Sequence, residues 1–443
     1  MNLNEPEEPS REIPSSGWRA TFASLSIPEY SLYFWGMLAF FSGMNMMIVL
    51  RGYLVYDLTG DPKALAAIML SVSLPMLLIA PIGGVITDRV DRRSLMLVAQ
   101  LAVALVNLVN TVLILTDLVA FWNLVVMSVL SGIAFSFNMP ARQAAMPNLV
   151  PRQLLMNAMS LGSSAMNATR IVAPAVGGLL IAPIGIGGGF AVLTGLYFLA
   201  AVLTLGLPKM PPKDRDMAVT FFSDFKGGFS YIKGDKLVLG LLLLGTIPMI
   251  FAMPYQTLLP VFTEEVWDVG PTGLGFLQAM AGVGGLAGTL ITANMDRSPR
   301  KGWLMLVAAC MTGVFLMAFS YSIYGVALAM IAIVGLTSMI FMTVNNTMIT
   351  SLIPDNVRGR VSSVLMMTFG LMPLGVVPAS IAADAIGVEA VTAIGGGLLI
   401  LSVLATYAVF PQFRTLDSAV KAQRTEREAA WDAEAAAPAA GGG

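Results

Sequence analysis

The chain of 443 residues contains no histidine and a single cysteine, Cys310. Without histidine it can have neither an imidazole proton relay nor a histidine-ligated metal site, and one cysteine cannot form a disulfide within the chain or a thiolate cluster. The sequence also lacks the glycine-rich loop followed by Lys and Ser or Thr that binds ATP phosphates, and no nucleophile has a paired base. We therefore expect no metal, no cofactor and no enzymatic activity.

Charge is scarce as well, because only 12% of the residues are charged, against about 25% in an ordinary soluble protein. With 56% hydrophobic residues and a mean hydropathy of +0.79, the chain is predicted to be an integral membrane protein. Its apolar runs are continuous rather than alternating, which favours helices over a β-barrel. The first 30 residues are polar and acidic and lack the pattern of a secretory signal peptide. The predicted fold class is an all-α membrane protein.

Twelve apolar runs are long enough to cross a bilayer as helices of about 20 residues. They lie near residues 32–56, 64–87, 95–116, 119–141, 154–182, 188–206, 238–263, 272–295, 302–320, 323–349, 362–383 and 387–410. A proline-rich, basic segment divides them into two sets of six, which predicts two pseudo-symmetric six-helix bundles. The predicted domains are a cytoplasmic N-terminal segment (1–31), an N-terminal bundle (32–206), a cytoplasmic linker (207–237), a C-terminal bundle (238–410) and a polar, partly disordered cytoplasmic tail (411–443).

Basic residues gather on one side of the predicted spans. Nearly all Lys and Arg outside the spans fall in loops that an even span count puts on the same side, and Lys63 is the exception. The positive-inside rule assigns that side to the cytoplasm. The sequence therefore predicts a multi-pass protein of the cell (inner) membrane with both termini in the cytoplasm. Leu149-Val150-Pro151-Arg152 after the fourth span has a counterpart in Leu352-Ile353-Pro354-Asp355 after the tenth, which indicates a duplication.

A short charged loop, residues 84–93, separates the second and third predicted spans. It contains Gly84, which would let helices approach closely, and Asp88, an acid at the membrane edge that needs a partner. Arg142, at the inner end of the fourth span, lies at the depth of Asp88, so we predict an ion pair that acts in gating. The alternative is a plain cytoplasmic loop whose arginines only set the topology. The predicted gating residues are Gly84, Asp88, Arg89, Arg92, Arg93 and Arg142.

Two arginines, Arg51 and Arg170, lie deep in their spans, in the outer half of the bilayer, where a charge is costly. Arg170 continues a polar stripe at helical spacing along the fifth span. Such a stripe either packs against another helix through hydrogen bonds or faces a water-filled translocation pathway, which we prefer. For Arg51, snorkelling toward Asp57 and a place in the cavity are equally compatible with the sequence. The other members of the stripe are Ser160, Ser163, Ser164 and Asn167.

Further polar side chains within the spans are candidates for the wall of this cavity. The predicted cavity residues are Arg51, Asn45, Asn138, Ser163, Asn167, Arg170, Tyr255, Gln256, Gln278, Asn345 and Asn346. The 30 methionines, including Met44, Met46, Met47, Met366, Met367 and Met372, either form an adaptable wall or fill gaps in the packing, which is the commoner use. No acid lies in the middle of a span, and the candidates for proton coupling, Asp57, Glu264 and Asp384, are near the outer ends.

Several motifs resemble one family. They are the loop of residues 84–93, Phe137-Asn138-Met139-Pro140-Ala141-Arg142-Gln143, Pro147-Asn148-Leu149-Val150-Pro151, Ala173-Pro174-Ala175-Val176-Gly177-Gly178 and Pro354-Asp355-Asn356-Val357-Arg358-Gly359-Arg360. From about residue 27 to 410 the chain looks like the enterobactin-exporter-like branch (drug and siderophore efflux) of the major facilitator superfamily, although Asp91 and Ala173 stand where many members have glycine. The resemblance implies proton coupling, alternating access by two rocking halves, and a latch between the loop acid and the start of the eleventh span near Arg360, Val361 and Ser362.

We therefore expect a secondary active transporter that exports a small amphiphilic, drug- or siderophore-like compound. Two basic side chains in the cavity would favour an anionic one. The alternatives are an importer or a lysophospholipid flippase of the same fold and, from another class, a receptor or scaffold that does not transport, which would leave the polar stripe unexplained. The expected partners are the small-molecule substrate, the lipid bilayer and H+ as the coupling ion. We expect a monomer and no nucleic-acid partner.

Overall fold

The computed structural model describes residues 21–212, 230, 232–295, 301–353, 361, 364, 368–410 and 412–413. Within these ranges the chain forms helices joined by short turns and contains no strand, so the all-α prediction is confirmed. The helices are η1 (Ala23–Ser26), α2 (Pro28–Thr59), α3 (Pro62–Arg89), α4 (Arg92–Leu115), α5 (Phe121–Ala145), η2 (Met146–Asn148), η3 (Arg152–Leu154), α6 (Leu155–Leu205), α8 (Lys236–Phe251), α9 (Pro254–Val261), the π-helical turn η4 (Phe262–Val266), α10 (Gly270–Asn294), α11 (Lys301–Ser320), α12 (Tyr324–Leu352), η5 (Phe369–Leu371), α14 (Pro373–Ile386) and α15 (Val388–Val409).

Ten helical segments of the described chain are long and apolar enough to cross a membrane, and α14, with 14 residues, is a shorter apolar helix. Helix α6 has 51 residues and is interrupted at Gly185, whose φ of 68° and ψ of 175° suit glycine. This break lies where the sequence predicts the boundary between two spans. Counting α6 as two spans and α14 as one more would reach the predicted twelve, a count that stays a prediction.

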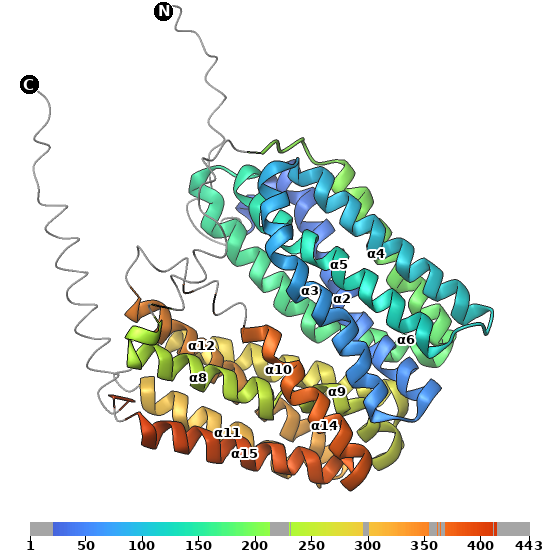
Figure 1. Ribbon diagram of the computed structural model, residues 1–443. Helices are drawn as coiled ribbons and strands as arrows, with labels where there is room; N and C mark the ends of the chain where they lie inside the picture. The colour runs from blue at the N-terminus through green and yellow to red at the C-terminus, as the bar shows by residue number, and fades with distance from the viewer. Residues whose placement is uncertain are drawn as a thin grey trace, which may run out of the picture.

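The helices form two groups that lie side by side (Figure 1). In the first, α2 packs along α6, α3 along α5, and α4 against both α5 and α6. In the second, α10 packs along α12, α11 against α12 and α15, and α8 against α15. We call these groups the N-half (residues 28–205) and the C-half (residues 236–409). The predicted domain boundaries stay predictions, because much of segments 1–31, 207–237 and 411–443 lies outside the described residues.

Glycines allow equivalent close helix pairs in the two halves. A Cβ atom on Gly83 would collide with the carbonyl oxygen of Ser136 where α3 crosses α5. A Cβ atom on Gly284 would collide with the carbonyl oxygen of Ala332 where α10 crosses α12. Small residues at such crossings let helix backbones approach closely. The second and fourth predicted spans of each half therefore pack by the same device.

The two halves meet along two helix pairs, because α6 packs on α10 and α3 packs on α14. At the α6–α10 crossing, a Cβ atom on Gly275 would lie 2.8 Å from the carbonyl oxygen of Pro174, and one on Gly178 would collide with the carbonyl oxygen of Pro271. Only glycine fits these positions without displacing backbone. The crossing is therefore among the tightest contacts between the halves.

The helix ends form two layers that differ in the sign of the charge that predominates. One layer holds Arg89 and Arg92, at the α3–α4 turn, and we call it the basic end. The other holds Asp57, Glu264 and Asp384, and we call it the acidic end. Helices α2, α4, α8 and α14 begin nearer the basic end and run toward the acidic end, while α3, α5, α10, α12 and α15 run back.

A helix break in the C-half shapes the interior. Pro254 has no N–H group, so the carbonyl of Ile250 loses the donor that a continuous helix would supply. The N–H of Ala252 still donates to the carbonyl oxygen of Pro248 at 2.9 Å, and the chain then restarts as α9. The break lies between α8 and α9, directly before Tyr255.

Candidate substrate-binding cavity

A cavity of about 400 Å³ lies between the two halves. The N-half contributes α2 and α6, and the C-half contributes α8 to α12 and α15. This volume falls within the range of about 300–1,000 Å³ that is common for small-molecule sites. Six of the predicted residues line it, namely Asn45, Asn167, Arg170, Tyr255, Gln256 and Gln278.

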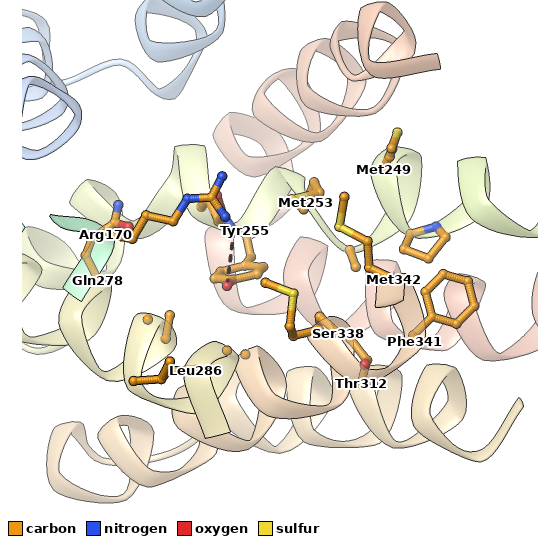
Figure 2. Close-up of a pocket in the computed structure, with 18 of the residues that line it drawn as sticks. Arg170, Met249, Met253, Tyr255, Gln278, Leu286, Thr312, Ser338, Phe341 and Met342 are labelled. Carbon is orange, nitrogen blue, oxygen red and sulfur yellow. Dashed lines mark hydrogen bonds between the residues drawn. The ribbon is translucent and has the colours of Figure 1, made fainter. Parts of the chain in front are cut away.

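Arg170 is the one charged side chain among the described residues that line the cavity. It is exposed to the cavity, and its guanidinium has no hydrogen-bond or ion-pair partner in the described part of the chain. In Figure 2 the side chain extends toward Tyr255, and Gln278 lies near its stem. Gln256 Nε2 donates to the Tyr255 hydroxyl at 3.4 Å. These groups give one end of the cavity a cationic and hydrogen-bonding character.

Asn45 fixes the polar end of the cavity on the α2 side. Its amide donates to the carbonyl oxygen of Phe41 at 2.8 Å and to Thr169 Oγ1 at 3.3 Å. The second bond joins α2 to α6 one residue before Arg170. Asn45 therefore both lines the cavity and holds the helix that carries the arginine.

The opposite wall is apolar and rich in methionine, as the labelled Met249, Met253 and Met342 in Figure 2 show. Of the methionines named from the sequence, Met44 lines the cavity, whereas Met46 and Met47 are buried in the core. Met372 is not among the lining residues, and Met366 and Met367 lie outside the described residues. The lining residues that were not predicted from the sequence include Met249, Met253, Met339, Met342, Thr312 and Ser338.

A signal for the missed methionines was present in the sequence. Met249 and Met253 are four residues apart, and Met339 and Met342 are three apart, so each pair shares one helix face. Thr312 is a different case, because its single hydroxyl proton has two acceptors within reach, the Ala308 carbonyl oxygen at 2.9 Å and Thr337 Oγ1 at 2.8 Å. Its side chain is thus already satisfied by helix packing.

Five predicted cavity residues do not line this cavity. Arg51 Nη1 donates to Ser128 Oγ at 3.4 Å, within the N-half. Asn138 is fully buried and directs its amide to the carbonyl oxygen of Met96 at 3.5 Å. Asn345 is buried beside Gly245, whereas Asn346 and Ser163 are exposed outside the lining. A place for any of these five in the substrate pathway is a prediction without support from the cavity geometry.

Arg142 lies inside the N-half and is 4% exposed. Its guanidinium carbon lies 5.4 Å from the ring centroid of Tyr33, 5.2 Å from that of Phe40 and 5.9 Å from that of Phe41. Its Nη2 donates to the side-chain oxygen of Gln100 at 2.9 Å once that amide is oriented to satisfy its neighbours. Among the described side chains its neighbours are uncharged. The side chain of Asp88 lies outside the described residues, so the predicted ion pair stays a prediction.

The charged loop is tied to the chain that follows α6. Asp91 accepts hydrogen bonds from the Ser94 N–H at 2.9 Å and from the Met210 N–H at 2.5 Å, and the Arg92 N–H donates to the Met210 carbonyl at 3.1 Å. Arg93 donates to the Leu205 carbonyl at 2.5 Å. Of the predicted gating residues, Arg92 and Arg93 are therefore engaged with neighbouring segments.

The remaining residues of the loop differ in their surroundings. Arg89 is exposed. A Cβ atom built on Gly84 would meet no described atom within 4 Å, so the expected close approach at Gly84 stays a prediction. A close contact within the described residues is made by Gly83, whose face of α3 turns toward α5. Burial raises the cost of charging Asp91, but the hydrogen bonds from Ser94 and Met210 outweigh it and lower the pKa of Asp91 below its ordinary value.

At the acidic end, side chains connect the two halves directly. The Tyr56 hydroxyl of α2 donates to Glu265 Oε1 of η4. Lys63 of α3 forms a salt bridge with Asp384 of α14, with 2.5 Å between Nζ and Oδ2. These contacts, together with the α6–α10 crossing, close this end of the space between the halves. The predicted gating residues did not include Tyr56, Glu265 or Lys63.

The three candidates for proton coupling also lie at the acidic end, away from the cavity lining. Asp57 is exposed, and Asp384 is held in the salt bridge with Lys63. Glu264 is half-buried near Asp57 and Asp268, and its Oε1 has no hydrogen-bond partner in the described part of the chain. Glu264 is therefore the least satisfied of the three carboxylates.

Residues 19–436 match the family described as "Transmembrane secretion effector". The chain belongs to this family of the major facilitator superfamily, and it is a membrane transporter of small molecules rather than an enzyme. This outcome confirms the resemblance drawn from the motifs.

Several relatives are named as efflux proteins or exporters. The chain is 26% identical to macrolide efflux protein A of Streptococcus pyogenes, over 77% of this chain and 86% of that protein. It is 27% identical to the enterobactin exporter EntS of Escherichia coli, over 73% of this chain and 78% of the exporter. It is 28% identical to the multidrug efflux pump Tap of Mycolicibacterium fortuitum, over 86% of this chain and 95% of the pump.

Solved structures share the fold at lower identity. A POT family transporter in complex with 5-aminolevulinic acid superposes with a TM-score of 0.68 and 13% identity, covering 90% of this chain and 99% of that one. A bacterial homologue of the human lysosomal transporter Spinster, in an inward-facing and unoccupied conformation, gives a TM-score of 0.66 at 13% identity, with 90% and 98% covered. The fold class is therefore that of major facilitator transporters.

Proposed function

We propose that this protein exports a small amphiphilic compound with an anionic group from the cytoplasm by alternating access, coupled to protons. The observation that carries the proposal is Arg170, an unpartnered guanidinium in a cavity between the two halves, opposite a methionine-rich wall. A charge placed at membrane depth without a protein partner is expensive, and such residues commonly serve a substrate or ion. An anionic group on the substrate would supply the missing partner.

The rest of the cavity suits an amphiphile. Tyr255, Gln256 and Gln278 offer hydrogen bonds near the arginine, so a polar head can be oriented there. The methionines opposite have flexible, polarisable side chains that adapt to apolar groups of different shape. No carboxylate is among the described lining residues, which disfavours a cationic substrate. Drug-like or siderophore-like acids fit these requirements.

The arrangement of contacts supports an inward-facing state for this structure. We assign the basic end to the cytoplasm by the positive-inside rule, and with it we propose that both chain termini are cytoplasmic and that the protein lies in the cell (inner) membrane. The acidic end is closed by Tyr56–Glu265 and Lys63–Asp384. Ser160, Ser163 and Ser164 of α6 are exposed between the basic end and Arg170 and would form a polar route to the cavity.

Gating would open one end while closing the other. Breaking the contacts at the acidic end would let the halves rock apart there, as transporters of this kind do. The predicted cytoplasmic latch, between Asp88 and the start of the eleventh span, concerns side chains outside the described residues, and it remains part of the proposal. We favour Glu264 as the proton carrier, because it combines partial burial with an unsatisfied oxygen near Asp57.

Efflux of a matched pair of dyes tests the proposal. Dansylglycine carries a carboxylate, and dansylglycinamide differs from it by having a neutral amide in that place. In cells that carry the wild-type protein, we expect faster loss of preloaded dansylglycine than of the amide. Arg170→Gln should slow the efflux of dansylglycine roughly tenfold or more, because a charge-assisted hydrogen bond contributes about 1.5–3 kcal/mol, and Arg170→Lys should retain part of it.

Lys209→Gln, which removes an exposed positive charge outside the cavity, is the control and should behave like wild type. A protonophore should abolish efflux if protons supply the energy. Wild-type cells that accumulate the carboxylate instead of losing it would indicate import. Efflux that is equal for both dyes in wild type and in Arg170→Gln would rule out recognition of an anion at Arg170.

A further inference from the structure

A second cavity, of about 210 Å³, lies on the outer side of the C-half. It is a groove between α14 and α15, and the α8–α9 break forms its floor. Its mouth is bordered by Leu374, Ile386 and Ile394, which are 62%, 54% and 51% exposed. In a membrane transporter such exposed apolar side chains face the hydrocarbon of the bilayer. The groove therefore opens to lipid rather than to water.

The floor of the groove is backbone brought close by glycine. A Cβ atom on Gly395 of α15 would lie 2.6 Å from the carbonyl oxygen of Phe251, and one on Gly375 of α14 would collide with that of Ile250. The Ile250 carbonyl is the one that has no helical N–H donor, because residue 254 is proline. These close approaches fix α14 and α15 to the end of α8. The position of the recess between them is therefore fixed by these backbone contacts.

One polar atom in the groove lacks a partner. Thr392 lines the groove and is 4% exposed, and its Oγ1 has no hydrogen bond in the described part of the chain. In a helix a threonine hydroxyl usually bonds a carbonyl one turn back. A buried hydroxyl without a partner is costly, so an acceptor from a ligand would stabilise it. Thr392 lies in the first turns of α15, near the acidic end.

The length and position of the groove match one leaflet of a bilayer. Along α14 it extends from Ile386, at the acidic end, to Leu374, which corresponds to about 18 Å of helix. Half of a hydrocarbon core is about 15 Å thick. A lipid of the leaflet at the acidic end would place its ester carbonyl at the depth of Thr392 and its chain along the groove.

We propose that this groove binds one acyl chain of a bilayer phospholipid, with the Thr392 hydroxyl donating to the ester carbonyl of that lipid. The inner wall of the groove contains Ala252 and Tyr255, which also line the central cavity. The bound acyl chain therefore packs against Tyr255, whose hydroxyl accepts a hydrogen bond from Gln256. A lipid in this place would support the wall of the cavity at the α8–α9 break.

Photocrosslinking of the full chain in lipid nanodiscs tests this site. The probe is phosphatidylcholine with a diazirine in its sn-2 acyl chain, and the adducts are mapped by mass spectrometry. We expect adducts on residues 391–398 of α15 to exceed those on the lipid-facing Leu199 and Val202 of α6 at least tenfold. Ala379→Trp and Ala382→Trp, which fill the groove from α14, should each lower the groove adducts at least fivefold. Two variants are used so that misfolding of one leaves the test intact.

Ala385→Trp is the matched control, because Ala385 is exposed on the same helix and does not line the groove. It should leave the groove adducts unchanged. Thr392→Val keeps the shape and removes the hydroxyl, and it should lower the groove adducts about fivefold, the equivalent of one hydrogen bond. Adducts spread evenly over the lipid-facing helices would overturn the proposal. So would loss of the groove adducts on adding dansylglycine, because the groove would then belong to the transport pathway. The test does not depend on transport activity.

Discussion

The N-half and the C-half are built from equivalent helix pairs, but they bury different chemistry. In the N-half the buried polar side chains include two arginines, a glutamine and five asparagines, while the C-half buries hydroxyl groups and a single asparagine among its described residues. The C-half also contains the α8–α9 break and the short helix α14, and it supplies most of the cavity wall. The packing of helices in the N-half thus depends on hydrogen bonds between them, whereas the packing in the C-half depends on apolar contacts around a cavity.

This difference suggests that the two halves contribute differently to substrate binding. Hydrogen bonds between buried side chains on different helices, such as Asn45–Thr169 and Arg142–Gln100, hold the helices of the N-half in one arrangement, because a different packing would leave these groups unpaired. A wall of methionine and small residues can change its packing at low cost. We therefore expect the N-half to present Arg170 from a fixed frame, and the C-half to adapt to the apolar part of the substrate.

The largest effect should come from the buried cation of the N-half. Arg142→Ala removes a guanidinium packed among three rings and leaves Gln100 without its donor, so we expect a loss of about 3 kcal/mol in unfolding free energy. Thermal unfolding of the purified protein, followed by circular dichroism, measures it. Arg142→Met keeps most of the volume without burying a charge and should cost much less.

Thr312→Val is the corresponding change in the C-half. It removes the hydroxyl bond to Thr337 and should cost about 1 kcal/mol. Equal losses for Arg142→Ala and Thr312→Val would break the contrast between a polar N-half and an apolar C-half.

The next effect concerns the contacts that join the halves at the acidic end. Tyr56→Phe removes the hydrogen bond to Glu265, which contributes about 1 kcal/mol, so the population open at the acidic end should rise about fivefold. Distances between spin labels on the two halves at this end report the change. Lys63→Ala is expected to do less, because an exposed ion pair contributes about 0–1 kcal/mol. Unchanged distances in both variants would mean that these contacts do not hold the end closed.

The smallest effect should come from the loop between α3 and α4. Asp91 caps α4 through the Ser94 N–H, and Asp91→Ala should lower stability by about 1 kcal/mol at neutral pH. Because the pKa of Asp91 in the folded protein is below its ordinary value, this contribution is fully present above about pH 4 and is lost as the pH falls through the lower, folded value. The difference between the thermal melts of the two proteins should therefore shrink as the pH falls from 7 to 3. A gap that widened toward pH 3 would contradict the assignment.

Much of the fold could be read from the sequence because long apolar runs and segregated charge leave few alternatives for a chain in a membrane. The break near Gly185 was predicted from the interruption of two apolar runs, and the structure has it there. The break between α8 and α9 was not, since Pro248 and Pro254 lie within one continuous apolar run and proline is common in membrane helices.

The cavity was predicted in part, and the limit is helix rotation. A polar stripe identifies Asn167 and Arg170 because several residues share one face. A lone asparagine carries no such information: Asn345 and Asn346 are adjacent in sequence and point about 100° apart, and neither lines the cavity. Asn138, another asparagine within a span, is buried inside the N-half and does not line the cavity either. Which face meets the cavity is set by the packing of neighbouring helices, which one sequence does not reveal.

The central claim is that Arg170 recognises an anionic group in the cavity between the halves. Equilibrium binding of dansylglycine and dansylglycinamide to the purified protein in nanodiscs measures it directly, without relying on transport or on a coupling ion. We predict that wild type binds the carboxylate roughly tenfold or more tightly than the amide, and that Arg170→Gln binds both alike. An undiminished preference for the carboxylate in Arg170→Gln would contradict the account.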